Sequence, residues 1–279
     1  MKRFWTFKKH RRLDGRKIPP LKTDGTLHSE QPEKADILNG PFQKLFQKKN
    51  SISNEEFQKQ CKMTGKFNTI KDINITENGV HKLLKNLNPN KTAGPDNITP
   101  RVIKELATYS TNINHIFRCS YQTSEVPDIW KSTNICPVHK KGKIYDPIHY
   151  RPVSLTCVPC KLMEHVITNH IMFHANTQNI IYPFHHGFQR GLSCELQLIE
   201  FIDDVAKNLD QGKQTDCLIM DFSKTFDKVS HSLIIHKLTH YGITGKNDWI
   251  KNFLSDRTQS VVVEGETSTS IPVESEVPQ

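Results

Sequence analysis

The sequence contains no long apolar run. None of its hydrophobic stretches approaches the ~18 residues that a transmembrane helix needs. The N-terminus also lacks the apolar core of a secretory signal. These absences argue against membrane partners, and we expect an intracellular protein of the nucleus or cytoplasm.

Cysteine is scarce and irregularly spaced. Seven cysteines, an odd number, do not form the pattern of a disulfide framework. Cys157 and Cys160 make one C-x-x-C, but no second pair supplies the other ligands of a zinc site. We expect reduced, structural thiols there, and packing or polar contacts rather than metal binding at His185 and His186.

Basic residues are abundant. The chain of 279 residues carries 38 Lys and Arg against 29 Asp and Glu, a formal net charge of +9. This surplus favours an anionic partner, most simply a nucleic acid, although a basic but unspecialised surface is the alternative. Within residues 1–35, cations surround Phe4, Trp5 and Phe7, which suits phosphate and base contacts or a nuclear localisation patch. A disordered basic tail explains the same composition.

An apolar run from Cys217 to Met220 ends abruptly in Asp221. Such a run is too short for a helix and predicts a buried strand. A carboxylate held at the tip of a strand suits a metal ligand, and the alternative is an aspartate that only caps a turn. Ser230 is the predicted N-cap of the next helix, through Leu238.

Four helices are predicted from their spacing and caps. Thr76 caps the first, Thr99-Pro100 opens the second, Pro159 opens the third, and the fourth spans the end of residues 185–209. Their expected buried residues are Val80, Leu83, Leu84 and Leu87; Val102, Ile103, Leu106, Ile113, Ile116 and Phe117; Leu162, Met163, Val166 and Ile167; and Ile202 and Val205. Asp203 and Asp204 are expected on the solvated face of the fourth helix.

A β-hairpin is predicted at residues 134–155. Strands at 134–138 and 150–155 flank the basic turn His139-Lys140-Lys141-Gly142-Lys143. Lysine and arginine supply fixed positive charge, and the guanidinium of Arg151 offers a planar fork to phosphate oxygens. A solvated hairpin tip is the alternative. Two more strands are expected around Glu264-Gly265.

Several strings together resemble reverse transcriptases of non-LTR (LINE-type, jockey-like) retrotransposons. LIMDFSKTFDKVSHSLIIHKLTHYGI resembles the first catalytic palm motif of that family, and VPDIWKSTNICPVHKKGKIYDPIHYRPVSL resembles its fingers hairpin. NPNKTAGPDN, HHGFQRG and the terminal VPQ resemble further motifs, in the same order. Departures from the family pattern are Asn97 for glycine, Gln189 for arginine, Thr225 for alanine and Glu276 for glycine. Asn97 still tolerates a left-handed turn.

The resemblance implies roles for individual residues. Asp221 would be the catalytic, metal-binding aspartate with Phe222 beside it in the metal site, and Phe226 would exclude a 2′-hydroxyl. The nucleotide contacts would be Lys140, Lys141, Arg151, Phe226 and Gln279. Which of the two lysines contacts phosphate is left open. The same resemblance predicts a helix at residues 36–46, which Gly40-Pro41 would interrupt.

The implied fold is α+β, with right-hand polymerase fingers and a partial palm, incomplete at the C-terminus, behind a basic, partly disordered N-terminal segment. The expected divisions are a linker (1–70), a helical part of the fingers (71–130) and a reverse transcriptase domain (131–279). The function implied is RNA-directed DNA synthesis from an RNA template, a DNA primer and dNTPs with two Mg²⁺ ions. Because the Asp-Asp motif is absent, we expect this fragment to be inactive alone. The alternative is a non-catalytic nucleic-acid-binding remnant.

Overall fold

The computed structural model describes residues 17–46, 54–61, 67–70, 72–222, 225–245 and 247–275. Its elements are β1 (Leu21–Thr23), β2 (Thr26–His28), α2 (Gln31–Gln43), α3 (Asn54–Cys61), α4 (Glu77–Lys85), α5 (Pro100–Glu105), the 3₁₀ turn η1 (Leu106–Tyr109), α6 (Ser110–Thr123), α7 (Asp128–Lys131), β3 (Ser132–His139), the 3₁₀ turn η2 (Pro147–His149), β4 (Tyr150–Leu155), α8 (Val158–Thr177), α9 (Cys194–Asp210), α10 (His231–His240), α11 (Asn247–Leu254), β5 (Thr258–Val263), β6 (Glu266–Thr267) and β7 (Ile271–Pro272). This mixture confirms the α+β class. Gln279 and the basic segment 1–16 lie outside the described residues. In the part described, every helix is too short or too polar to cross a bilayer.

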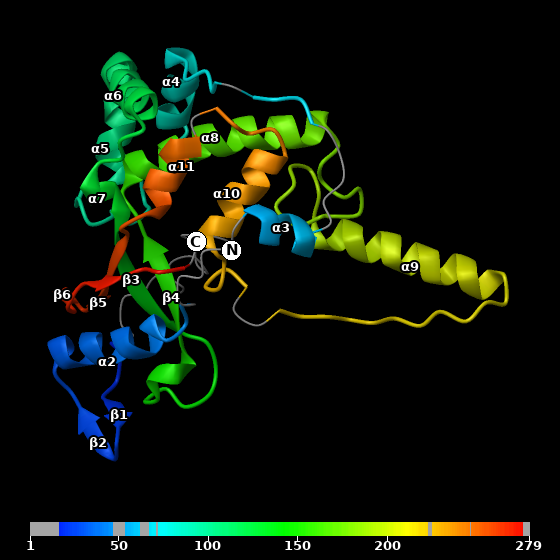
Figure 1. Ribbon diagram of the computed structural model, residues 1–279. Coiled ribbons are helices and arrows are strands. Elements are labelled where there is room, and N and C mark those ends of the chain that lie inside the picture. Colours follow the sequence, from blue (N-terminus) through cyan, green and yellow to red (C-terminus); the bar gives the residue numbers. More distant parts are fainter. Residues whose placement is uncertain are drawn as a thin grey trace, which may run out of the picture.

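A five-stranded sheet forms the centre of the fold, with the order β4-β3-β5-β6 and with β7 pairing to β5. β3 and β4 are antiparallel, with Asn134 opposite Leu155 and His139 opposite Tyr150. β5 runs parallel to β3. The predicted hairpin and the strand pair around Glu264-Gly265 are confirmed. Helices α4 to α8 and α11 gather at one end of the sheet, and α2 lies toward the other (Figure 1).

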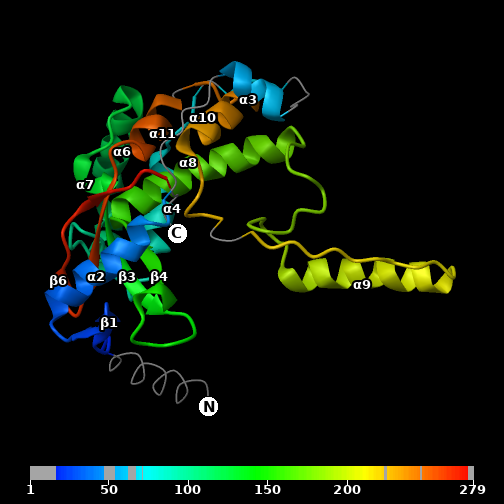
Figure 2. The ribbon, with the colours of Figure 1, turned by 60° about the horizontal axis from the view of Figure 1, so that its bottom comes forward.

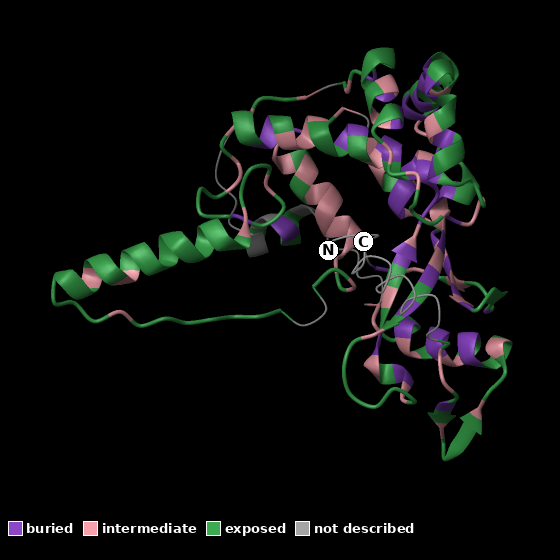
Figure 3. Cartoon of the chain, turned by 180° about the vertical axis from the view of Figure 1, so that it is seen from behind, coloured by how far each residue is buried: buried purple, intermediate pink, exposed green. Residues whose placement is uncertain are grey.

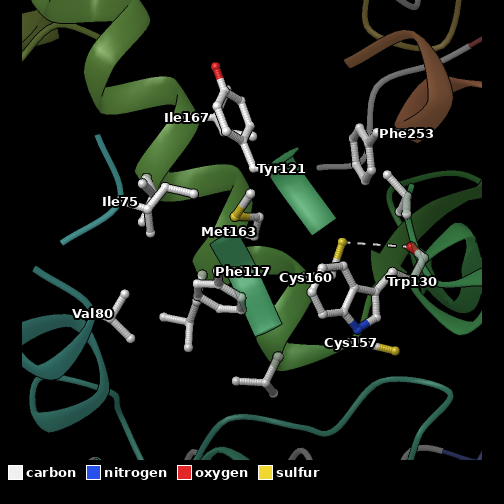
Figure 4. Packing of buried hydrophobic residues seen from close by; sticks show 14 of the residues in the cluster. Ile75, Val80, Phe117, Tyr121, Trp130, Cys157, Cys160, Met163, Ile167 and Phe253 are labelled. Atoms are coloured by element: carbon white, nitrogen blue, oxygen red, sulfur yellow. Dashed lines mark hydrogen bonds between the residues drawn. The ribbon is translucent and has the colours of Figure 1, made fainter. Parts of the chain in front are cut away.

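The larger hydrophobic core lies among α4 to α8 and α11. Its members include Phe117 and Trp130, which meet edge to face with ring centroids 6.0 Å apart. Figure 4 shows these rings beside Met163 and Cys160, whose thiol donates to the Trp130 carbonyl. All four residues predicted to be buried on α8 are buried: Leu162, Met163, Val166 and Ile167. The third predicted helix is therefore confirmed along its core face.

The second predicted helix is interrupted. The chain forms α5, the turn η1 and then α6 between residues 100 and 123. Ile103 and Phe117 are buried as predicted, but Val102, Leu106 and Ile116 are exposed. A single helical period does not fit both α5 and α6, because the 3₁₀ turn η1 between them changes which residues of α6 face the core.

Helix α2 runs through Pro41, so the predicted interruption at Gly40-Pro41 is wrong. A proline normally clashes with the Cβ of the helical residue before it, but Gly40 has no Cβ. Pro41 also lies in the last turn, where it removes a single backbone donor. Leu38 and Phe42 are buried against the sheet beside Val261, and this packing stabilises the helix.

The predicted helix starts are confirmed in position. Thr76 Oγ1 accepts a hydrogen bond from the Gly79 amide at 3.2 Å, and Thr99 caps α5 in the same way. Ser230 precedes α10 but makes no side-chain cap. Its hydroxyl instead lies 3.0 Å from that of Ser232. Ser230 therefore predicted correctly where the helix begins, but not which hydrogen bond its hydroxyl makes.

The loop around Gly94 is packed against the first turn of α8. A Cβ built on Gly94 would lie 2.5 Å from the Cys157 nitrogen and 2.6 Å from the Thr156 oxygen, so only glycine fits. Asn97 has φ +56°, which confirms the left-handed turn expected there. The loop is thus a docking point between α4 and α8 rather than a simple connector.

Residues 193–222 form an arm, made of α9 and the extended segment 213–222 that runs back beside it (Figures 1 and 2). At the turn between α9 and this segment, the Lys213 amide donates to the Asn208 carbonyl at 2.8 Å. No residue of α9 is buried (Figure 3). Asp203 and Asp204 are exposed as predicted. Ile202 is not a core residue, because nothing in the described chain packs over its 57% exposed side chain; Val205 is only half-buried.

Candidate nucleotide and metal site

The hairpin of β3 and β4 presents one face to solvent. Val138 and Arg151 are register partners, as are Cys136 and Val153, and all four side chains are exposed. The opposite face carries Ile135 and Tyr150 into the core with α2. Alternation along the strands therefore fixes Arg151 on the outer face, with its guanidinium available to a ligand.

The loop at residues 140–146 is ordered by its own hydrogen bonds. The Lys140 amide donates to the His149 carbonyl at 3.0 Å, and the Asp146 amide donates to Lys143 at 3.1 Å. Gly142 has φ +89°, and a Cβ there would meet the His149 ring at 2.8 Å. Lys140 and Lys141 are both exposed on this loop. The structure thus brings both lysines onto the hairpin that carries Arg151.

The predicted strand before Asp221 is wrong. Residues 213–222 have no regular secondary structure. Leu218, Ile219 and Met220 are 82%, 88% and 75% exposed, and Phe222 and Asp221 are exposed as well. A buried strand needs partners for its backbone groups and a core for its apolar side chains. The described chain places neither beside this segment.

Phe226 meets an aromatic residue that sequence reasoning missed. Its ring centroid lies 5.7 Å from that of Phe188, and the rings are steeply inclined at 82°. Phe188 has φ +58°, an uncommon conformation for a bulky residue. The two rings come from separate motifs, HHGFQRG and the segment after Asp221. A shared aromatic character was the only signal in the sequence, and it does not predict contact.

The same loop contains a buried histidine. His186 Nδ1 lies 3.1 Å from the Phe184 carbonyl oxygen, and its Nε2 lies 3.2 Å from a carboxylate oxygen of Glu200 on α9. Gln189 donates to the His185 carbonyl at 3.1 Å. His186 therefore has the polar contacts predicted for this pair.

Within the described ranges, no group of three or more His, Cys, Asp or Glu side chains is placed to hold a metal ion. Asp221 is accordingly not a member of such a group in that part of the chain. The main-chain carbonyl of Asp227 accepts a hydrogen bond from the Ser275 hydroxyl at 2.7 Å. The described residues by themselves do not fit a two-ion site, whose ions need several oxygen ligands.

The C-x-x-C thiols are structural. Both are buried, and Cys157 donates to the Ile129 carbonyl at 3.3 Å. Burial raises the pKa of Cys157 to about 11 and raises the pKa of Cys160 far above its usual range. Both therefore stay protonated at neutral pH in the absence of a bound metal.

Residues 138–279 match the family described as reverse transcriptase (RNA-dependent DNA polymerase). This match includes the β3–β4 hairpin from Val138, the loop with Phe188, the arm and Asp221.

Curated relatives are similar over most of this chain. It is 28% identical over 207 residues to the RNA-directed DNA polymerase from mobile element jockey of Drosophila melanogaster, covering 74% of this chain and 23% of that protein. It is 24% identical over 279 residues to the probable RNA-directed DNA polymerase from transposon BS of the same species, covering 95% of this chain and 30% of that protein. It is 27% identical over 192 residues to the probable RNA-directed DNA polymerase from transposon X-element of Drosophila melanogaster, covering 68% of this chain and 21% of that protein. The chain thus spans 21% to 30% of the length of these relatives.

Proposed function

Because this chain belongs to the reverse transcriptase (RNA-dependent DNA polymerase) family, we propose that it forms the fingers and first palm segment of an RNA-directed DNA polymerase of a non-LTR mobile element. The whole enzyme would copy an RNA template from a DNA primer, with dNTPs as substrates. The names of the jockey, BS and X-element relatives support this assignment.

The observation that carries the proposal is the outer face of the hairpin. Arg151 projects from the second position of the paired strand β4, and Lys140 and Lys141 stand exposed on the adjoining loop. A triphosphate carries several negative charges in a short length, and a strand-mounted guanidinium with flexible lysines beyond it matches that distribution. We assign Arg151 and one of the two lysines to the triphosphate.

The remaining roles are proposed on the family pattern. Asp221 with the Phe222 carbonyl would supply one side of a divalent-metal site, typically for Mg²⁺, and Phe226 would lie under the incoming sugar. Gln279 would lie by the nascent base pair. Since Asp221 belongs to no group of three or more possible ligand side chains within the described residues, metal-dependent chemistry needs ligands from elsewhere.

A second candidate is a nucleic-acid-binding remnant without catalysis. The lack of a group of three or more possible ligand side chains in the described chain favours it, and the net charge of +9 is compatible with either candidate. The two candidates share the binding of nucleic acid and differ in primer extension.

Binding of a fluorescent dATP analogue with Mg²⁺ tests the hairpin in this chain. Arg151→Ala should weaken binding by about 10- to 100-fold, the scale of a hydrogen bond between charged groups. Arg151→Lys should restore little, because lysine lacks the planar fork. Arg118→Ala is the matched control, since Arg118 is an equally charged, exposed residue on α6. Equal binding by the parent and Arg151→Ala would remove the assignment.

Primer extension on poly(rA)·oligo(dT) separates the two candidates. We expect no extension by the chain of 279 residues. A polypeptide extended with a family-type segment that carries the Asp-Asp hairpin and thumb should synthesise DNA, and Asp221→Ala should abolish that synthesis. Extension by the short chain that disappears in its own Asp221→Ala variant would show that the further carboxylates are dispensable.

A further inference from the structure

Residues 17–46, comprising β1, β2 and α2, form an N-terminal module that is bonded to the far side of the sheet. Glu264, at the β5–β6 turn, accepts a hydrogen bond from the Ile18 amide at 3.1 Å and lies 3.6 Å from the Lys34 ammonium. Lys34 is buried, and it donates to the Ile18 carbonyl at 2.8 Å. The turn and the module are therefore joined by polar contacts between exposed Glu264 and a module in which Lys34 is buried.

A second pair of contacts joins α2 to the segment after β6. Asp36 accepts from both the amide and the hydroxyl of Thr269, at 2.9 and 3.0 Å. Asn39 donates its side-chain amide to the Thr269 carbonyl at 2.8 Å. Side chains on successive turns of α2 thus hold Thr269, and α2 cannot slide along the sheet without breaking these bonds.

The module also packs directly under the hairpin. Leu21, Leu38 and Phe42 share one buried cluster with Ile135 and Tyr150, which lie on β3 and β4. Arg151, the residue assigned to the triphosphate, follows Tyr150 in the chain and points to the opposite face. The module therefore supports the back of the strand whose front is proposed to bind nucleotide.

The fingers loop, residues 140–146, is held from this module at its far end. The Lys22 amide donates to the Tyr145 carbonyl at 2.8 Å. The Tyr150 hydroxyl donates to the neighbouring Ile144 carbonyl at 2.6 Å. Lys22 pairs with Leu27 in β1–β2, but its N–H is directed to the loop. Two consecutive carbonyls are thereby fixed in a loop whose side chains, apart from that of half-buried Asp146, are exposed.

We propose that the N-terminal module is a clamp that fixes the conformation of the fingers loop and thereby sets the affinity of the hairpin for a triphosphate. The proposal rests on the proposed function of the hairpin. An exposed loop that is already ordered loses less conformational entropy when a ligand binds to it. Lys22 and Tyr150 act here as positioning residues, since neither is assigned to the nucleotide.

The Lys22–Tyr145 hydrogen bond offers a clean test in this chain. Lys22→Pro removes the amide donor at the edge of a two-stranded sheet, where proline is tolerated. Lys22→Ala removes the same side chain but keeps the amide, so it is the matched control. Hydrogen exchange of the Lys140, Asp146 and His149 amides reports on the order of the loop, and titration with the fluorescent dATP analogue reports on affinity.

We expect Lys22→Pro to exchange these amides about three- to tenfold faster, the scale of one backbone hydrogen bond, and to weaken dATP binding by a similar factor. Lys22→Ala should match the parent in both. Equal loop exchange in the proline and alanine variants would overturn the clamp. So would a loosened loop that binds dATP as tightly as the parent.

Two further arms separate other causes of failure. If Lys22→Pro melts the module, seen as lost protection of the Leu38 and Phe42 amides, an ester in place of the Lys22 amide removes the same donor without restricting φ. If the parent and Arg151→Ala bind dATP equally, the proposed function of the hairpin fails. Loop exchange alone then decides whether the module fixes the loop.

Discussion

Gly94→Ala is a sharp test of how the fold is assembled. The added methyl would lie 2.5 Å from the Cys157 nitrogen and the Thr156 carbonyl carbon, and 2.6 Å from the Thr156 oxygen. All three are backbone atoms immediately before α8, the helix whose buried face lines the larger core. They cannot turn aside as the end of a flexible side chain would.

The expected loss follows from two opposing effects. Overpacking by one methyl costs about 1–3 kcal/mol, and rigid backbone neighbours favour the upper part of that range. Replacing glycine by alanine also reduces the freedom of the unfolded chain, which stabilises by about 0.4–1 kcal/mol. The net destabilisation is therefore about 2 kcal/mol. For a chain of this size that corresponds to a fall in Tm of about 4–8 °C.

Urea unfolding followed by tryptophan emission measures this change, because Trp130 and Trp249 are buried in the same core. Gly187→Ala is the matched control. A Cβ at Gly187 would meet its nearest atom, on the His185 ring, at 3.7 Å, an ordinary contact. We expect that variant to be as stable as the parent or slightly more so. A Gly94→Ala protein that equals the parent in stability would refute the close packing of this loop on α8.

Three further predictions concern charge and burial. Burial raises the pKa of the Glu164 carboxyl above its ordinary value, so the folded state holds its proton more tightly than the unfolded state. Stability should therefore fall as pH rises from the unfolded pKa through the folded one, and Glu164→Gln should remove that fall in urea titrations across pH. In the native protein, iodoacetamide should modify the exposed Cys119, Cys136, Cys194 and Cys217 but spare the buried Cys157 and Cys160 until urea unfolds the core, as read by mass spectrometry. Binding to a labelled RNA–DNA hybrid should weaken steadily as salt rises, measured by anisotropy, and salt-independent binding would contradict an electrostatic interface.

Local signals explain what the sequence predicted well. Patterns among residues close together in the sequence predicted the hairpin strands, the α8 face and the caps at Thr76 and Thr99. Asn97 was interpreted correctly for the same reason, since a left-handed turn is a property of one residue. The signal for each of these features lies in residues that are close together in the sequence.

Contacts between residues far apart in the chain explain the structural features that the sequence did not predict. Nothing near Lys22 or Tyr145 indicates that their backbones meet, and α2 continues through Pro41 because the sheet packs against Leu38 and Phe42. The run at residues 217–220 has real strand character, but that character produces a strand only when a partner and a core are present. Sequence pattern predicts the need for such partners and not their position.

The proposed triphosphate contacts lie in a well-packed part of the chain, and the proposed metal contacts lie in a poorly packed part. The hairpin with Arg151 is supported on its inner face by α2, whereas Asp221 lies on an arm whose apolar residues remain exposed. Triphosphate contacts and metal contacts therefore depend on different packing. The first, as proposed, need only the sheet and the module behind it, and the described chain contains both. The second need a group of three or more ligand side chains and a covered strand before Asp221, and the described chain contains neither. The proposed nucleotide binding should accordingly be separable from the proposed catalysis, and failure of primer extension alone would not argue against the proposed site on the hairpin.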